Sequence, residues 1–373
     1  MWLNEAFATW MAFSIMERVF PQYETNLRLP QDRAFPVDRR TTSKAIRKTV
    51  RNEKEIVDGI GLNYTKGHSI LNMLEAYVGP QRFRESIQAC LKKYAWGNAT
   101  EADLWGVLSQ TSGLDVAEIA SGFLNQLGFV SLQIEGDGTV VQKRYLTYGR
   151  EAADLQWKIP LNVKYKKDGE VRETFYLLTD KSGTIDVPSD TDWLFPDAGG
   201  NGYFRWTVDT EQLYNLVDDA DELTDREKIA LLSNSEALLS SGDLTLADYL
   251  FVLNRMLDDP HPLVFLPALE KLKLIGDEFI GESNRELLAH FVDQALSKRF
   301  QSVGIDEKDT DTEAVVQMRP RLMRVLGQYG TDISARDAAA SAAMKYLHAP
   351  ESISSDLGRE ALRVTAMSDD GEL

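Results

Sequence analysis

The stretch Met1-Trp2-Leu3-Asn4-Glu5-Ala6-Phe7 opens the chain and begins an amphipathic segment. We expect one helix over Trp2–Phe20, stopped by Pro21. The residues that follow Glu5 on its own helix face are all small, namely Ala8, Thr9 and Ala12. A stripe of small side chains lets another helix approach closely. By itself, however, an acidic residue in a first helical turn is favoured by the helix dipole and is usually solvated.

A second informative stretch is Asn63-Tyr64-Thr65-Lys66-Gly67. The apolar residues after it are spaced as one helix face and are Ile70, Leu71, Leu74, Tyr77 and Val78, before Gly79-Pro80 ends the helix. A Tyr is most often a half-buried core residue. Gly67, one turn after Tyr64, predicts that no side chain blocks the space above the ring. We expect Lys66 to pair with a carboxylate, and His68 to be a surface or packing residue.

Both stretches resemble motifs of the aminopeptidase N family of zinc metallopeptidases, the gluzincins. Residues 2–7 resemble its W-L-N-E-(G/A)-F-A motif, and Tyr64–Leu74 resembles its Y-x-K-G-x-x-x-L-x-M-L segment. The resemblance implies that Glu5 is the third zinc ligand and that Tyr64 stabilises the transition state. It also implies zinc as the cofactor and peptides with a free N-terminus as substrates.

The rest of that family's site is absent from this sequence. A catalytic zinc needs three protein ligands and one open position for water. In the family two His ligands come from H-E-x-x-H, whose Glu is the general base, and a G-x-M-E-N loop grips the free amine. The sequence has neither motif, and its four His are His68, His261, His290 and His348. We therefore expect the C-terminal part of such an enzyme, inactive alone and unable to retain zinc.

Composition narrows the choice of partners and compartment. The net charge of −17 argues against a nucleic-acid partner and against an acidic membrane surface, because both require basic patches. No apolar run approaches the roughly 18 residues that would span a bilayer. The single Cys90 excludes an intramolecular disulfide. We expect a soluble protein and favour a bacterial cytoplasm, with export left open; the oligomeric state is not predicted.

The pattern predicts a multidomain α+β protein with three parts. Residues 1–128 read as helices and, by the resemblance, form the helical C-terminal half of a thermolysin-like catalytic domain. Over residues 129–208 apolar and polar residues alternate, and turns such as Lys167-Asp168-Gly169 join the runs, which predicts a small antiparallel β-sandwich. Residues 209–373 read as an α-helical, HEAT-like solenoid that is incomplete.

In the last part we expect a capping box at Thr224–Glu227 and helices near 245–257, 263–275, 283–299, 313–328 and 334–348.

Three hypotheses for function follow. The chain is part of a zinc aminopeptidase; or it is a non-catalytic scaffold whose sandwich and solenoid bind peptides or partners; or it is an unrelated structural protein with chance motif matches. The first is our interpretation.

Overall fold

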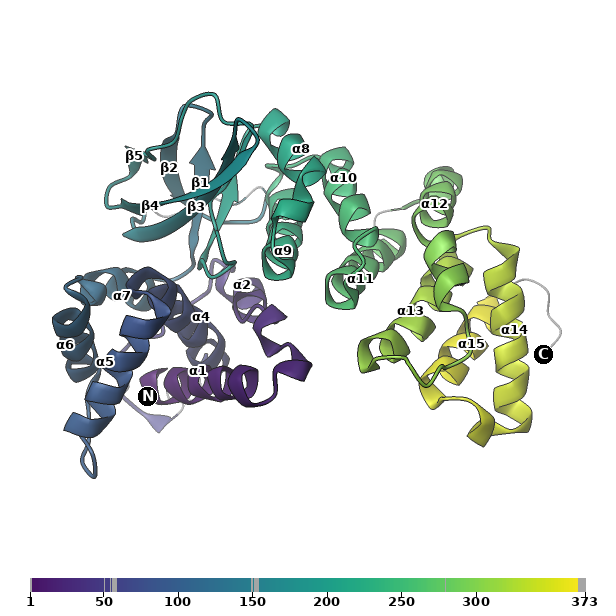
Figure 1. The fold of residues 1–373 in the computed structure, drawn as a ribbon, viewed down its shortest axis with the longest axis horizontal. Coiled ribbons are helices and arrows are strands. Elements are labelled where there is room, and N and C mark those ends of the chain that lie inside the picture. Colours follow the sequence, from purple (N-terminus) through teal and green to yellow (C-terminus); the bar gives the residue numbers. More distant parts are fainter. Residues whose placement is uncertain are drawn as a thin grey trace. The chain divides into compact units, whose positions relative to one another are not determined.

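The computed structural model describes residues 2–49, 51–53, 55, 59–148, 150, 154–278 and 280–367. The chain divides into two compact units, Met1–Tyr249 and Leu250–Leu373 (Figure 1). The first combines helices with two small sheets, and the second is a group of helices. Within the described ranges, no helix has the length and apolar character needed to cross a membrane.

The first part of the chain is helical, as predicted. Its helices are α1 (Trp2–Val19), α2 (Gln31–Asp38), α4 (Ile60–Val78), α5 (Pro80–Lys93), α6 (Glu101–Ser112) and α7 (Val116–Asn125), with short 3-10 turns η1 (Pro21–Tyr23) and η2 (Thr25–Leu27). The predicted first helix is confirmed to within one residue, because Pro21 begins η1. Thr100 and Asp103 form a capping box that begins α6.

The stretch between the first helix and about Gly61, which the sequence predicts to be rich in loops, also contains the helix α2. α2 is short and holds Pro36, so it lacks the length and periodicity of a predictable helix. It is stabilised by packing instead. The Phe35 ring lies 4.3 Å from the Phe129 ring and 4.9 Å from the Tyr203 ring, centroid to centroid. Residues 50, 54 and 56–58 of this stretch lie outside the described residues.

α4 is the central helix of this part. It packs against α1, α2, α5, α7 and strand β3 (Ile159–Lys167). The predicted apolar face is confirmed, since Ile70, Leu71 and Leu74 are fully buried. α4 ends at Gly79, whose positive φ of 91° suits a residue without a side chain, and Pro80 then begins α5.

The β region forms two small sheets from the strands β1 (Val130–Ile134), β2 (Thr139–Arg144), β3, β4 (Glu170–Leu178), β5 (Ser182–Thr184), β6 (Trp193–Phe195) and β7 (Phe204–Thr207). Their orders are β5-β2-β1-β7 and β4-β3-β6. The small antiparallel sheets agree with the prediction, with one difference: β1 and β7 pair in parallel. Alternation along one strand does not reveal the direction of its partner, so this pair was not predictable.

The predicted hairpin turn between β3 and β4 is present. Asp168 and Gly169 both have positive φ, at 53° and 77°, as the tight turn of a two-residue hairpin requires. Helix α9 (Asp225–Ser241) is joined to β7 by the Asn234 side chain. Its amide donates to the Trp206 carbonyl at 2.9 Å and accepts from the Trp206 N–H at 3.1 Å.

The remaining chain is helical apart from its connections. After α8 (Thr210–Asp218), η3 (Ala220–Glu222) and α9, its elements are α10 (Leu246–Leu257), α11 (Pro262–Glu278), η4 (Glu282–Asn284), α12 (Arg285–Val303), α13 (Glu313–Tyr329), α14 (Ile333–His348), η5 (Pro350–Ser352) and α15 (Ser355–Met367). The capping box at Thr224 and the five predicted helices are confirmed, and α15 is additional. In the second unit α13 packs against α11, α12, α14 and α15. The HEAT-like solenoid and the three domain boundaries stay predictions.

Asp197, in the connection after β6, is a buried carboxyl with a large pKa shift. Burial raises its pKa to about 7, although the Gly202 N–H donates to it at 2.7 Å and the charge of Arg226 opposes the shift. The unfolded value is about 3.9. Since the folded-state pKa is the higher one, this carboxyl favours folding at low pH and loses that contribution as the pH rises from about 4 to about 7.

We expect Asp197→Asn to change the pH dependence of stability. The amide oxygen can still accept from Gly202, and the amide does not ionise. We compare the free energy of unfolding of the variant with that of the original protein at each pH. The difference, variant minus original, should rise by a few kcal/mol, about 4 at most, as the pH increases from about 4 to about 8. Urea unfolding followed by tryptophan fluorescence measures it. Asp218→Asn, at an exposed position, is the control for the loss of charge alone. If the stability difference between Asp197→Asn and the original protein is the same at both pH values, the raised pKa of Asp197 is contradicted.

Candidate active site

The structure brings Glu5 and Tyr64 together from two helices. Glu5 lies in the first turn of α1 and is half-buried, and Tyr64 lies in the first turns of α4 with 39% of its surface exposed. A side-chain hydrogen bond with Glu5 is the main cause that raises the pKa of the Tyr64 phenol. The phenol therefore keeps its proton at neutral pH and can serve as a hydrogen-bond donor.

The two helices meet closely at Ala6 and Gly67. A methyl group on Gly67 would lie 2.5 Å from the Cβ of Ala6 and 3.5 Å from the Trp2 ring. Gly67 therefore faces α1, and the prediction that it leaves open the space above the Tyr64 ring stays a prediction. Of the predicted stripe of small residues, Ala8 and Ala12 are exposed and take no part in this crossing, so their contact with a further helix stays a prediction. The close approach occurs one residue after Glu5.

Lys66 pairs with a carboxylate, as predicted, and the partner is Asp38 of α2. Both side chains are fully buried, and the Lys66 Nζ lies 2.9 Å from Asp38 Oδ2. The ammonium also donates to the carbonyls of Gly128 at 3.0 Å and Gln126 at 3.2 Å, while Asp38 accepts from the Tyr203 hydroxyl at 3.0 Å. Burial lowers the pKa of Lys66, and Asp38 opposes that shift. This network fixes α4 to α2 and to the β region.

Two tryptophans, Trp2 and Trp10, fix α1 through carboxylates that the sequence did not single out. The Trp2 Nε1 donates to Glu101 at 2.7 Å, and Trp105 donates to the other oxygen of Glu101 at 2.8 Å. Further along α1, the Trp10 Nε1 donates to Glu75 of α4 at 2.9 Å. Trp side chains this buried usually satisfy their N–H, but the partners of Trp2 and Trp10 lie far away in the sequence.

The histidines do not form a ligand set. His68 is buried against the Phe13 ring, 5.0 Å between centroids, and burial lowers its pKa to about 4, as fits a packing residue. His261 accepts from the Leu263 N–H at the start of α11. His290 and His348 are exposed on α12 and α14. Among the described residues, no group of three or more His, Cys, Asp and Glu could hold a metal ion.

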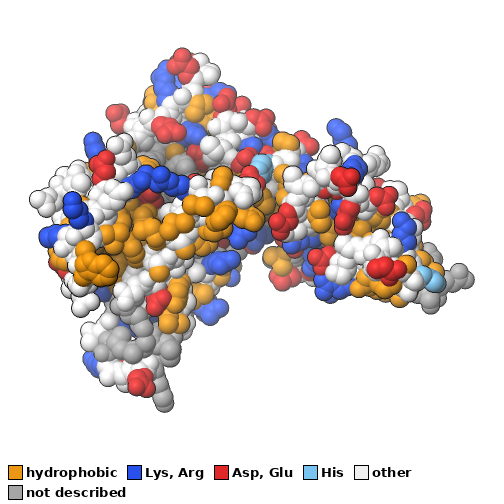
Figure 2. Space-filling model, turned by 60° about the horizontal axis from the view of Figure 1, so that its bottom comes forward, with side chains coloured by type: hydrophobic (Ala, Val, Ile, Leu, Met, Phe, Trp, Pro, Cys, Tyr) orange, Lys and Arg blue, Asp and Glu red, His pale blue; other side chains and the backbone are white. Residues whose placement is uncertain are grey.

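Figure 2 shows hydrophobic side chains gathered on one face of the molecule. In the last turns of α1 and the residues just after it, the exposed large hydrophobic residues are Ile15, Val19, Phe20 and Tyr23, at 43–56% of their surfaces. Exposed apolar surface of this kind is typical of contact with a partner segment.

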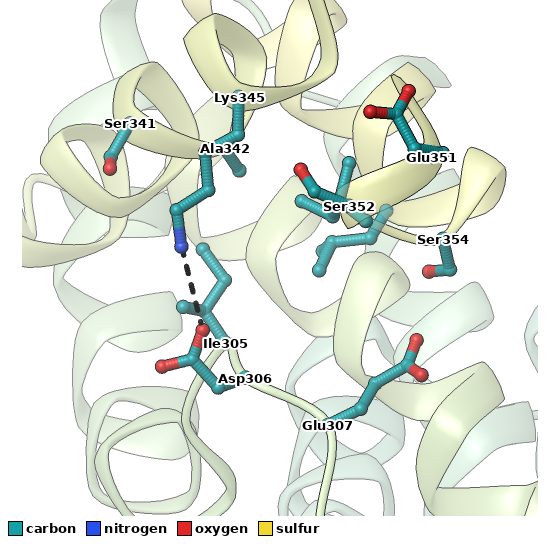
Figure 3. A pocket seen from close by; sticks show the side chains of 11 residues that line it. Ile305, Asp306, Glu307, Ser341, Ala342, Lys345, Glu351, Ser352 and Ser354 are labelled. Carbon is teal, nitrogen blue, oxygen red and sulfur yellow. Dashed lines mark ion pairs between the residues drawn. The ribbon is translucent and has the colours of Figure 1, made fainter. Parts of the chain in front are cut away.

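A cavity of about 460 Å³ lies within the second unit, lined by residues of loop 304–307, α14, η5 and the start of α15 (Figure 3). Ala342 and Leu357 are its buried apolar lining, and the Lys345 Nζ lies 3.8 Å from an Asp306 carboxylate oxygen. Glu307 is also part of the lining. None of the predicted site residues line this cavity, so it has no part in the candidate active site.

Comparisons with known proteins cover both ends of the chain. Residues 1–123 match the peptidase family M1 domain, and residues 193–372 match the ERAP1-like C-terminal domain. Three relatives are each 26% identical to this chain. The first is the Tricorn protease-interacting factor F2 of Thermoplasma volcanium, aligned over 83% of this chain and 39% of its own length. The second is Aminopeptidase M1-D of rice (Oryza sativa subsp. japonica), aligned over 89% of this chain and 40% of its own length. The third is Aminopeptidase 2 of Candida albicans, aligned over 86% of this chain and 36% of its own length.

The chain thus spans about two fifths of the length of these curated relatives. The segment that contains Glu5 and Tyr64 lies inside the first match, and the helices from α8 to α15 lie inside the second. The resemblance seen in the sequence is therefore confirmed: residues 1–123 of this chain match the peptidase family M1 domain, that of the aminopeptidase N family, and residues 193–372 match an ERAP1-like C-terminal domain.

Proposed function

We propose that this chain is part of a zinc-dependent aminopeptidase that removes N-terminal residues from peptides. The observation that carries the proposal is the placement of Glu5 on α1 beside Tyr64 on α4, next to the close contact of Ala6 with Gly67, within the segment that matches the peptidase family M1 domain. Two of the relatives are named aminopeptidases, Aminopeptidase M1-D and Aminopeptidase 2, which supports peptide N-termini as the substrate.

Glu5 would supply one zinc ligand. A half-buried carboxylate can contribute one oxygen, whereas a catalytic zinc needs three protein ligands. The described residues hold no group of three or more possible ligands, so they fit one place in a ligand set and not the whole of it. Zinc held by a complete set would activate a water molecule for attack on the peptide bond.

Tyr64 would donate a hydrogen bond to the oxygen of the scissile carbonyl as negative charge develops on it. Such a donor must keep its proton. The interaction with Glu5 raises the pKa of the Tyr64 phenol, which favours the protonated form. One donor of this kind contributes about 3 kcal/mol to stabilisation of the transition state. The phenol is also exposed enough to be reached by a substrate, with 39% of its surface accessible.

At the level of architecture, we propose that residues 1–128 are the helical half of a thermolysin-like catalytic domain and that the last helices form a HEAT-like solenoid. Support comes from the two family matches and from the packing of α13 against helices near it in sequence.

The gene product that contains this sequence tests the proposed function. Purified and assayed with aminoacyl-anilides, it should show turnover that a chelator abolishes and added zinc restores. Turnover that is indifferent to chelation would contradict a zinc enzyme, and failure to cleave any substrate with a free N-terminus would contradict an aminopeptidase.

This chain alone is expected to retain no stoichiometric zinc after dialysis, because one carboxylate cannot replace a set of three ligands. Metal analysis by mass spectrometry measures it, and Glu5→Gln is the matched control, with the same background zinc expected in both proteins. With zinc added, we also expect no hydrolysis of aminoacyl-anilides. One tightly held zinc per chain that disappears in Glu5→Gln would show that this chain contains a complete ligand set.

A further inference from the structure

The crossing of α1 and α4 lies beside both residues of the candidate site. Ala6, on α1, is fully buried and follows Glu5 directly. Gly67, on α4, comes one helical turn after Tyr64. Between them there is no room for another carbon, since a methyl group on Gly67 would lie 2.5 Å from the Ala6 Cβ.

Space, and not backbone conformation, accounts for the glycine at this position. Gly67 lies inside α4 and has no positive φ, so its backbone is one that any residue adopts. Glycine is disfavoured in helix interiors relative to alanine. Gly61, in the first turn of the same helix, differs: a methyl group there meets nothing within 4 Å.

Neither helix is free to move away from a larger side chain. α4 is held by the buried Lys66–Asp38 pair, directly before Gly67. α1 is held at its start by the bond from Trp2 to Glu101. An added methyl group would therefore have to be accommodated at the crossing itself, by a local shift or tilt of one helix against the other.

We propose that the contact between Ala6 and Gly67 is a positioning device that sets the distance between Glu5 and Tyr64. Its value for catalysis rests on the proposed function, whereas its effect on the geometry does not. Gly67 is in this view a positioning residue, which acts on the reaction through Tyr64 and touches no substrate.

The first test uses this chain and needs no enzyme activity. Gly67→Ala should lower the melting temperature by about 2 to 10 °C and move the ring-carbon NMR signal of Tyr64, assigned through Tyr64→Phe, in protein labelled with ¹³C-tyrosine. Adding Ala6→Gly makes room for the new methyl group and should restore the signal to its original position. Gly61→Ala is the control, one turn on the other side of Tyr64, and should leave the signal unchanged.

A Tyr64 signal that is the same in Gly67→Ala and in the original chain would overturn the proposal. So would a shift that Ala6→Gly fails to reverse. If Gly67→Ala alone does not fold, the variant carrying both substitutions decides, because the proposal requires it to fold with the Tyr64 signal of the original chain.

The second test concerns the active enzyme. Gly67→Ala should lower kcat about tenfold or more with a smaller change in KM, since a displaced donor is felt mainly in the transition state. Its effect on kcat should disappear in a Tyr64→Phe background, which a general loss of stability would not produce. An equal loss of kcat in both backgrounds would overturn positioning through Tyr64. If instead Tyr64→Phe alone leaves kcat unchanged, the proposed role of Tyr64 fails and the aminopeptidase activity itself does not, while the NMR result still stands for the geometry.

Discussion

Replacing Tyr64 by Phe in the aminopeptidase that contains these residues is expected to lower kcat by about a hundredfold or more, with little change in KM. The reason is that the phenol donates to an oxygen whose charge develops mainly in the transition state. In the structure, Tyr64 is half-exposed and its hydroxyl interacts with Glu5, so the hydroxyl lies at an accessible surface and not in the core. Phe keeps the ring and its packing and removes only the donor.

Steady-state kinetics on an aminoacyl-anilide measures this effect. Tyr77→Phe is the matched control, because Tyr77 belongs to the same helix and its ring packs against Phe175, 5.4 Å between centroids. That variant should stay within about twofold of the original kcat, since it loses no contact with the reacting atoms. Activity of Tyr64→Phe within the same twofold would show that Tyr64 is only a packing residue.

The sequence alone located the candidate site because its two motifs are local. Glu5 and Tyr64 each lie in a short run of sequence, and the end of the first helix was predicted to within one residue and that of the second correctly, at Gly79. What it could not supply is which residues meet between those helices. The small residues Ala8, Thr9 and Ala12 indicate a surface for a further helix, whereas the contact of α1 with α4 lies at Ala6 and Gly67 and was not predicted.

Partners at long range were missed for the same reason. Lys66 was expected to pair with a carboxylate, but its partner Asp38 lies at the end of a short helix in a stretch that reads mostly as loop. The parallel pairing of β1 with β7 is a similar case, since alternation in Val130–Ile134 shows a strand and not its neighbour. Local periodicity determines elements, while the choice of partner depends on tertiary packing.

The buried pair of Lys66 and Asp38 carries the other large expected effect. Lys66→Met should lower the free energy of unfolding by about 3–5 kcal/mol, because it leaves a carboxylate buried without its counter-charge. Both side chains have no exposed surface, and their charged atoms lie 2.9 Å apart. The substitution also removes the donor to the carbonyls of Gly128 and Gln126. Urea unfolding at neutral pH measures the loss, and Lys92→Met, exposed on α5, should change stability by no more than about 0.5 kcal/mol.

The cause of the loss can be separated from simple removal of a side chain. Asp38→Asn carries no charge, and its single amide oxygen can still accept from the Gly128 N–H, while its NH2 group can donate to the oxygen of the Tyr203 hydroxyl. Added to Lys66→Met, it should recover part of the lost stability, since position 38 then no longer holds a buried carboxylate that has lost its Lys66 partner. A combined variant less stable than Lys66→Met alone would contradict the unpaired carboxylate as the cause. Recovery would show that each charge of the Lys66–Asp38 pair depends on the other. Through this pair α4, the helix that carries Tyr64, is joined to α2 and to the β region.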